Sequence, residues 1–439
     1  MVTRAPIARP FVGLRYARKD FGGILAPPYD VVSADEQARL YRRDPFNVVR
    51  LELGCTAPDD SAEDNRYTRA ARTLEQWRHD GVLRYDDGPC LYAYTHDFPL
   101  RGETLARVGV FCALRLTPSE QGLVLPHEGT LRGPREDRRL LTLACQAQIS
   151  PVFILHDDAD GRIGAVISEM MAHQPAAEAL TNGERHRLRR CPQGELTERY
   201  CELVGQGPLF IADGHHRYET ALAVSDELKR AHPEASPQAA FNHVLALLCH
   251  AQQPGVVILP THRLLRLRSP DQRARLEELV GRHFTRHPVA CDAADPLGAA
   301  RTLIRAVDEV GQGVRFGIYT RAGGCALLSP NPESLPADPG PGGHDQLATV
   351  VIHRLLVDPV VEPHALSECV DYVTDEAEAV RRVDEGRYQC ALFLRPTTVE
   401  QVKRAAAVGL RMPGKSTYFY PKVPAGLVMS DISPGRTVP

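Results

Sequence analysis

The sequence predicts a protein of mixed α and β structure, of the α+β or α/β class. Short apolar runs that are typical of buried strands, such as 209–212, are interspersed with amphipathic stretches that are typical of helices. Residues 90–98 and 105–116 flank Arg101-Gly102-Glu103 and predict an antiparallel hairpin. The 43% hydrophobic and 24% charged residues match the composition of a soluble globular protein.

Charge and hydropathy exclude several classes of protein. The net charge of −3 argues against a nucleic-acid binder that relies on overall positive charge, so a nucleic-acid partner is not expected. No run of about 18 apolar residues is present, and the N-terminus lacks the apolar region of a signal peptide. The 11 cysteines are scattered without a CxxC pair, which predicts reduced thiols and a cytoplasmic location.

The N-terminal part contains a double proline that fixes the local backbone. Pro27-Pro28 imposes an extended or turn geometry and directs Tyr29 and Asp30 to a defined place, where they are candidates for binding a substrate. The alternative is a turn with a buried aromatic residue. The box 33–36 then starts a helix that runs to about residue 44, and 47–53 alternates like a strand.

The polar stretch 125–138 is rich in ionisable groups. His127 and Glu128 are candidates for a general base or a magnesium ligand, and Glu136 and Asp137 are candidates for the same roles. No second histidine follows Glu128 at the spacing of a zinc protease. The alternative is a charged surface loop that leads into a helix over 137–148.

The centre of the chain carries the clearest local signal. The apolar run 209–212 breaks at Asp213-Gly214 and continues as a helix that begins with His215, His216 and Arg217. A helix N-terminus with free N–H groups, next to a glycine and an arginine, is a good site for a phosphate. The alternative is a helix start with a solvated polar turn. Neighbours on a helix do not share a face, so the two histidines are not expected to bind one metal ion.

The second half continues the mixture of strands and helices. Residues 241–249 and 256–260 look like adjacent strands, and the second ends at Thr261-His262-Arg263, which either reaches a phosphate or forms an ordinary polar edge. Residues 330–343 contain many prolines and glycines and predict a linker or an exposed loop. We expect one domain over 1–265 and another over 266–439, with a C-terminal Lys-Ser-Thr segment returning to the first.

Residues 409–416 fit the P-loop pattern GxxxxGK[ST] in full. A P-loop needs a strand before it and a helix after it. Here a helix is predicted over 399–408, and the aromatic run 418–421 favours extended chain. The pattern is therefore not expected to form a P-loop, although Lys415, Ser416 and Thr417 remain candidates for binding a phosphate in another geometry.

Six blocks in order along the chain together resemble the bacterial and archaeal family catalogued as domain of unknown function 1015. They cover nearly the whole chain. The blocks are 26–32, 127–138, 150–153, 212–217, 259–263 and 415–422.

The block 213–217 is also similar to the phosphate-binding motif of the ParB/sulfiredoxin superfamily, which implies a nucleotide-binding core of that fold with additional lobes. His215 and His216 stand where sulfiredoxin has its catalytic cysteine, and no helix-turn-helix DNA reader is evident. Of the activities in that superfamily, a kinase acting on a small molecule remains.

This resemblance implies magnesium-dependent phosphoryl transfer from ATP or ADP to a small hydroxyl compound, with free L-serine as the first candidate. The alternatives are a nucleotide-binding regulatory protein without an acceptor and a ParB-like protein associated with nucleic acid. Glu128 or Asp137 would bind Mg²⁺ or accept the proton, with His127 beside them. The residues expected to hold phosphate groups are Asp213, Gly214, His215, His216, Arg217, Arg263, Lys415, Ser416 and Thr417.

Overall fold

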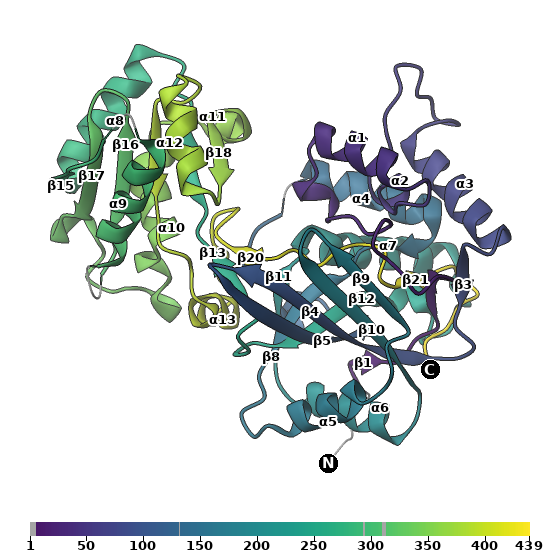
Figure 1. Ribbon diagram of the computed structural model, residues 1–439. Helices are drawn as coiled ribbons and strands as arrows, with labels where there is room; N and C mark the ends of the chain where they lie inside the picture. The colour runs from purple at the N-terminus through teal and green to yellow at the C-terminus, as the bar shows by residue number, and fades with distance from the viewer. Residues whose placement is uncertain (1–5, 131, 293–294, 310–312) are drawn as a thin grey trace. The chain divides into compact units, whose positions relative to one another are not determined.

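The computed structural model describes residues 6–130, 132–292, 295–309 and 313–439 (Figure 1). These residues form two compact units. The first contains the described residues of 1–126, together with 130–257 and 421–439. The second contains 127–129 and the described residues of 258–420. Both units combine helices with β-sheets, which confirms the predicted α+β class.

The described residues of the first unit form a nine-stranded mixed sheet with the order β6-β11-β8-β12-β5-β4-β10-β9, and β1 also pairs with β5. The predicted hairpin over 90–116 is confirmed as β4 and β5. The strands of this sheet are β1 (Ala8–Arg9), β4 (Cys90–Leu100), β5 (Glu103–Arg115), β6 (Val124–Leu125), β8 (Val152–His156), β9 (Ala177–Thr181), β10 (Glu184–Pro192), β11 (Leu209–Asp213) and β12 (His243–His250).

The two faces of this sheet differ in their side chains. Because side chains alternate along a strand, Ile154 and Ala246 face the apolar core, which α5 (Arg162–Met171) and α6 (Glu195–Val204) complete. The opposite face carries the alternate positions, including Phe153 and Cys249. Among the described residues, the remaining α-helices of this unit are α1 (Ala34–Arg43), α2 (Val49–Glu52), α3 (Arg66–His79), α4 (Arg132–Cys145) and α7 (His215–Ala231).

The C-terminal segment 421–439 is part of the first unit. Its strand β21 (Met429–Asp431) pairs with β2 (Gly13–Tyr16) and β7 (Ala147–Gln148) in a four-stranded sheet that β3 (Leu83–Tyr85) completes. A further bridge joins Thr437 to Ala239. The end of the chain is therefore held at several separate points of the first unit.

Two strand predictions were wrong. Residues 47–53 contain the helical turn of α2, because the Asn47 side chain accepts a hydrogen bond from the Val49 amide and donates to the carbonyls of Gly23 and Leu25. Strand β13 (Val257–Leu259) does not lie beside β12. It pairs instead with β20 (Tyr418–Tyr420).

The second unit is built on an antiparallel six-stranded sheet with the order β15-β17-β16-β19-β14-β18. One apolar cluster packs α8 and α10 against one face of this sheet, and another packs α9 and α12 against the opposite face. Figure 1 labels most of the elements of this unit. Among the described residues, its α-helices and the strands of this sheet are α8 (Pro270–His283), α9 (Pro296–Asp308), α10 (Ala348–Ile352), α11 (Leu366–Cys369), α12 (Glu376–Asp384), α13 (Val399–Ala407), β14 (His262–Leu265), β15 (Phe284–Val289), β16 (Phe316–Thr320), β17 (Gly324–Pro330), β18 (Val370–Val373) and β19 (Cys390–Phe393).

One pair of cysteines differs from the predicted reduced state. Cys291 and Cys325 form a disulfide, and the other nine cysteines are free thiols. The pairing of β15 with β17 places Val289 opposite Cys325, so Cys291 arrives next to it across a sequence separation of 34. The scattered spacing of the cysteines contains no signal for this contact.

Among the described residues, no helix is both long and apolar enough to span a bilayer.

The crowded sheet face of the first unit gives a stability prediction. A Cβ at Gly109 would lie 2.5 Å from the Cys249 Sγ and 2.9 Å from the Leu248 carbonyl oxygen. We expect Gly109→Ala to lower the free energy of unfolding by about 1–3 kcal/mol, because the backbone of β12 must shift. Urea denaturation measures this change. The control is Gly133→Ala in α4, where nothing lies within 4 Å of the added Cβ, and equal stability of the two variants would contradict the packing argument.

Candidate functional site

The turn between β11 and α7 has the predicted strand, glycine and helix order. Gly214 is the N-cap of the 17-residue helix α7 and has φ +91°, a left-handed conformation that glycine adopts without a steric cost. A Cβ at this position would lie 3.0 Å from the guanidinium carbon of Arg217. The glycine therefore allows the chain to turn and the arginine to fold back over the helix N-terminus.

The carboxylate of Asp213 lies between two cations of the first unit. Its Oδ2 accepts a hydrogen bond of 2.6 Å from Arg217, and its Oδ1 accepts one from the Nζ of Lys422. Burial alone would raise the pKa of Asp213, but the charges of Lys422 and Arg217 outweigh burial and hold this pKa well below its usual range. Two cations and one carboxylate leave a net positive charge at the start of α7.

Arg217 has a second acceptor, the carbonyl oxygen of Pro151. Its side chain also lines a cavity of about 40 Å³ together with Arg138, Glu52 and Ser150. A cavity of this volume has room for a few water molecules and is too small for a nucleotide.

Arg107 is a further buried cation of the first unit. It lies on β5, is 0% exposed, and donates 3.0 Å and 2.7 Å hydrogen bonds to the carbonyls of Gly255 and Pro421. Its guanidinium also lies 5.0 Å from the ring centroid of Phe153. Burial lowers the pKa of Arg107, and nearby groups that include Asp213 partly oppose this effect. This side chain therefore adds positive charge to the sheet face that carries Phe153.

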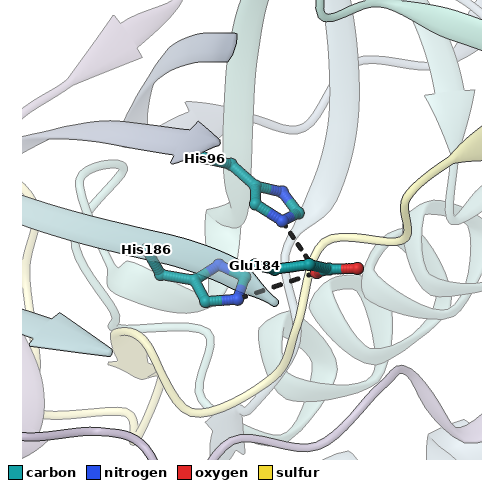
Figure 2. A group of neighbouring side chains, drawn as sticks. All are labelled: His96, Glu184 and His186. Carbon is teal, nitrogen blue, oxygen red and sulfur yellow. Dashed lines mark hydrogen bonds and ion pairs between the residues drawn. The ribbon is translucent and has the colours of Figure 1, made fainter. Parts of the chain in front are cut away.

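Next to Arg107, the same sheet face carries two histidines and a glutamate. His186, His96 and Arg107 lie directly opposite one another on β10, β4 and β5. Glu184 is two residues before His186 and so lies on the same face of β10. Figure 2 shows both imidazole rings directed at the Glu184 carboxylate. The Nε2 of His96 is 2.8 Å from the Glu184 Oε2, and the Nε2 of His186 is 3.8 Å from that oxygen.

Burial dominates the ionisation of this group. It lowers the pKa of His96 and the pKa of His186 to about 3, so that both rings are neutral at pH 7. Burial also raises the pKa of Glu184, which His186 and Arg107 partly oppose. The Nδ1 of His186 is 2.7 Å from the hydroxyl of Tyr94, and the Nδ1 of His96 is buried without a hydrogen-bond partner.

In the second unit, the structure brings three predicted residues together. The Oε1 of Glu128 accepts hydrogen bonds of 3.0 Å from the Thr417 amide and 2.9 Å from its hydroxyl. The Nε2 of His127 is 3.0 Å from the same hydroxyl. A parallel bridge between Glu128 and Met412 brings the two segments side by side. Residues 289 positions apart thus form one polar group.

The segment that fits the P-loop pattern is not a P-loop, as predicted. Helix α13 precedes it and the strand β20 follows it. Lys415 has φ +60° and an exposed side chain, and its carbonyl accepts hydrogen bonds from Thr261 (2.7 Å) and Arg263 (3.3 Å). The Ser416 hydroxyl donates a 2.6 Å bond to the carbonyl of Pro413.

Arg263 is fully buried, and burial lowers its pKa to about 10, an effect that Tyr372 and Glu128 oppose. The predicted phosphate-binding residue thus lies in the interior of the second unit. Besides Lys415, its donors reach the carbonyl and hydroxyl oxygens of Thr261.

Asp137, in the first unit, is surrounded by several hydrogen-bond donors. Its carboxylate accepts hydrogen bonds from Arg66, from the Tyr67 hydroxyl at 2.8 Å and from two nitrogens of Arg138 at 2.6 and 2.8 Å. The Arg138 guanidinium lies 4.0 Å from the ring centroid of Tyr29. Burial raises the pKa of Tyr29.

Asp30 is exposed on the surface of the first unit, next to Tyr29. The sequence-predicted residues therefore lie in separate groups. Residues 213–217 lie in the first unit with Asp137, Tyr29 and Asp30, whereas His127, Glu128, Arg263 and 415–417 lie in the second.

Sequence reasoning missed several residues of the first unit. Lys422 belongs to one of the recognised sequence blocks but was given no role. Glu184 and His186 have the i, i+2 spacing that places two side chains on one face of a strand, which was a usable signal. The pairing that brings His96 and Arg107 beside them joins strands far apart in the sequence, which no local pattern shows.

The family model described as Protein of unknown function (DUF1015) matches residues 8–364, and the chain therefore belongs to this family. No curated protein matches the chain.

Several solved structures are similar to the chain at low TM-scores. A conserved hypothetical protein from Pyrococcus furiosus has a TM-score of 0.35 and 12% identity, and the match covers 72% of this chain and 93% of that one. A free serine kinase in complex with AMP has a TM-score of 0.35 and 11% identity, with 71% and 86% coverage. SbnI with C-terminal truncation from Staphylococcus aureus has a TM-score of 0.32 and 10% identity, with 74% and 84% coverage. These likenesses are too weak to assign a site or an activity.

The pair between Lys422 and Asp213 gives a stability prediction. We expect Lys422→Met to lower the free energy of unfolding by about 3 kcal/mol, because the largely buried Asp213 carboxylate loses one of its two cations. Denaturant titration at pH 7 measures the change. The control is Lys229→Met, which removes an exposed lysine 3.8 Å from Asp226 on α7 and should cost less than about 1 kcal/mol. Equal decreases in the free energy of unfolding of the two variants would show that the pair between Lys422 and Asp213 contributes no more to stability than an exposed pair.

The lowered pKa of Asp213 also predicts a dependence of stability on pH. A carboxyl group with a lowered folded-state pKa stabilises the protein above its unfolded pKa of about 3.9, and this contribution is lost as the pH falls through the folded-state value. We expect Asp213→Asn to be less stable than the wild type at pH 7, with the difference shrinking between about pH 4 and pH 2. Denaturation at several pH values measures this, and a difference independent of pH would contradict it.

Proposed function

We propose that this protein is a nucleotide-dependent phosphotransferase that moves a phosphoryl group from ATP or ADP to the hydroxyl of a small metabolite, with free L-serine as the first candidate. The observation that carries the proposal is the net positive charge at the N-terminus of α7, where Lys422 and Arg217 share the carboxylate of Asp213. The similarity of the block 213–217 to the ParB/sulfiredoxin phosphate-binding motif supports the same assignment.

The N-terminus of helix α7 is the first part of the proposed phosphate site. The first turn of an α-helix presents N–H groups and the positive end of the helix dipole, which together favour an anion. Gly214 has no side chain to cap these groups, so a phosphate oxygen can approach the backbone closely. We propose that the amides at the start of α7 hold a phosphate of the nucleotide.

The two cations are already oriented before a ligand arrives. Asp213 holds the Arg217 guanidinium and the Lys422 ammonium in place, and both side chains are about 10% exposed. Fixed charges of this kind stabilise the charge of a transferring phosphoryl group without reorganisation during the reaction. Phosphoryl transfer depends mainly on such positioning and electrostatic stabilisation. Arg107 adds a further positive charge on the face of the nine-stranded sheet that carries Phe153.

The chemical step is a transfer between two oxygens. The hydroxyl oxygen of the acceptor forms a bond to the terminal phosphorus of ATP or ADP, and the bond from that phosphorus to the bridging oxygen breaks. ADP or AMP leaves, and the hydroxyl proton passes to a carboxylate base. We propose Glu128 as this base or as the ligand of Mg²⁺ from its sequence block alone, because carboxylate oxygens suit both roles.

The remaining predicted residues differ in how well their surroundings fit these roles. Asp137 is left out of the proposed mechanism, because four hydrogen bonds from two arginines and a tyrosine already occupy its carboxylate. Lys415 keeps an exposed side chain and stays a proposed phosphate ligand. Arg263 and Ser416 donate to backbone carbonyls, so we assign them to holding the segment around Lys415.

Phosphorus NMR of the purified protein tests the activity. The protein is incubated with Mg²⁺ and ATP, then with ADP, together with a pool of hydroxyl amino acids and small alcohols. We expect a new phosphomonoester signal, and omission of single components identifies the acceptor. Nucleotide binding without a new signal would favour a regulatory protein instead. Neither binding nor turnover would mean that the turn at Gly214 is only a helix start.

A matched pair of variants tests the proposed phosphate site. We expect Arg217→Ala to weaken nucleotide binding by about 10- to 100-fold, because a charge-assisted hydrogen bond is lost. The control is Arg230→Ala, at the opposite end of α7, which should bind nucleotide like the wild type. Isothermal titration calorimetry measures both affinities, and retained affinity in the first variant would exclude Arg217 from the site.

A further inference from the structure

We propose that His96, Glu184 and His186 form a binding site for one divalent transition-metal ion, of which Zn²⁺ is the representative. This site is separate from the proposed phosphate site and needs no nucleotide. Among the described residues, it is the one group of three or more histidine, cysteine or acidic side chains whose ligand atoms lie within metal-binding range of one another.

The separations of the three ligand atoms fit a single ion. Zn²⁺ binds imidazole nitrogen and carboxylate oxygen at about 2.0–2.2 Å, so two ligands in a tetrahedral shell lie roughly 3.4 Å apart. The Nε2 atoms of His96 and His186 lie 2.8 and 3.8 Å from the Glu184 Oε2, and all three atoms lie within 4.8 Å of one another. The two distances to Oε2, 2.8 and 3.8 Å, lie on either side of the roughly 3.4 Å of a tetrahedral shell and differ from it by about 0.6 and 0.4 Å.

The strand pairing holds the ligands in this arrangement. His186 lies directly opposite His96 on the neighbouring strand, and Glu184 is on the same face of its strand two residues earlier. Both ring nitrogens point at the same carboxylate oxygen (Figure 2). His96 is 0% exposed and His186 is 2% exposed, whereas the Glu184 side chain is 23% exposed, which leaves a side of the group open for an ion to enter.

The surroundings of His186 supply the support that a metal-bound histidine usually has. A histidine that binds a metal through Nε2 usually donates its Nδ1 hydrogen to an oxygen, which fixes the ring and its tautomer. The Nδ1 of His186 is 2.7 Å from the Tyr94 hydroxyl, which is buried. The Nδ1 of His96 is buried and has no hydrogen-bond partner, so this ring gains its polar interaction only through Nε2.

The ligand set also indicates the class of metal. Imidazole nitrogens suit zinc and the other first-row transition metals, whereas Mg²⁺ prefers oxygen ligands. Two histidines and one carboxylate are a set found in catalytic zinc sites, where the fourth position holds water or a substrate. The positive charge of Arg107 beside His96 disfavours a cation there, and the negative charge of Glu184 offsets it.

Titration with Co²⁺ of the full chain, after treatment with a chelator, tests this site. Visible bands of protein-bound Co²⁺ report nitrogen and oxygen ligands, and Zn²⁺ should abolish them by competition. We expect one Co²⁺ per chain in the wild type. Glu184→Gln and His186→Gln should each weaken binding by at least about tenfold. Because the Glu184 side chain is partly exposed, its substitution tests the site even if a histidine variant fails to fold.

The matched control is His250→Gln. His250 lies opposite His156 on the same sheet, with ring centroids 6.1 Å apart, and this pair belongs to no metal-binding group among the described residues. This variant should bind Co²⁺ like the wild type. Equal binding by the wild type and Glu184→Gln, or an equal loss in His250→Gln, would overturn the proposal. Phosphoryl transfer is measured separately with Mg²⁺, so the two proposals fail independently.

Discussion

The first unit depends on the carboxylate of Asp213, which joins three parts of the chain. Asp213 ends the strand β11, Arg217 belongs to the first turn of α7, and Lys422 belongs to the C-terminal segment. A largely buried carboxylate without partners would be costly, so the two cations stabilise this arrangement of the unit. The same interaction leaves a net positive charge beside the helix N-terminus.

The C-terminal segment connects this charge to the rest of the first unit. Pro421 accepts a hydrogen bond from Arg107, and Lys422 follows immediately with its bond to Asp213. Farther along, Met429–Asp431 enters the four-stranded sheet. Arg107 therefore donates a hydrogen bond to a carbonyl oxygen, and Lys422 donates one to a carboxylate. These hydrogen bonds lower the free-energy cost of removing the two cations from water. Our two proposals use fixed groups of the first unit, one to bind an anion and the other to bind a metal ion.

Local patterns in the sequence predicted local structure well. The strand, glycine and helix order around Gly214 was correct, because glycine and a change of periodicity are signals that a short window contains. The exclusion of a P-loop at 409–416 was also correct, because the elements before and after it could be predicted from the same kind of window. The strand predicted for residues 47–53 was wrong, because the Asn47 side chain forms hydrogen bonds that stabilise a helical turn despite the alternating pattern.

Contacts between distant segments could not be predicted. Glu128 and Thr417 were predicted as separate candidate site residues. The two hydrogen bonds between them join residues 289 positions apart in the sequence, which no local pattern indicates. Lys422 was overlooked because its partner Asp213 lies 209 residues away. His96, Glu184 and His186 were overlooked because their proximity depends on the register of β10 against β4. The family resemblance grouped six sequence blocks but did not show which of them are in contact.

The central claim is that a phosphate binds at the N-terminus of α7. A crystal structure of the full chain with ADP tests it most directly. The account predicts phosphate oxygens within hydrogen-bond distance of the amides at 214–216, with the side chains of Arg217 and Lys422 beside them. ADP bound elsewhere, with the first turn of α7 in contact only with solvent, would contradict the account.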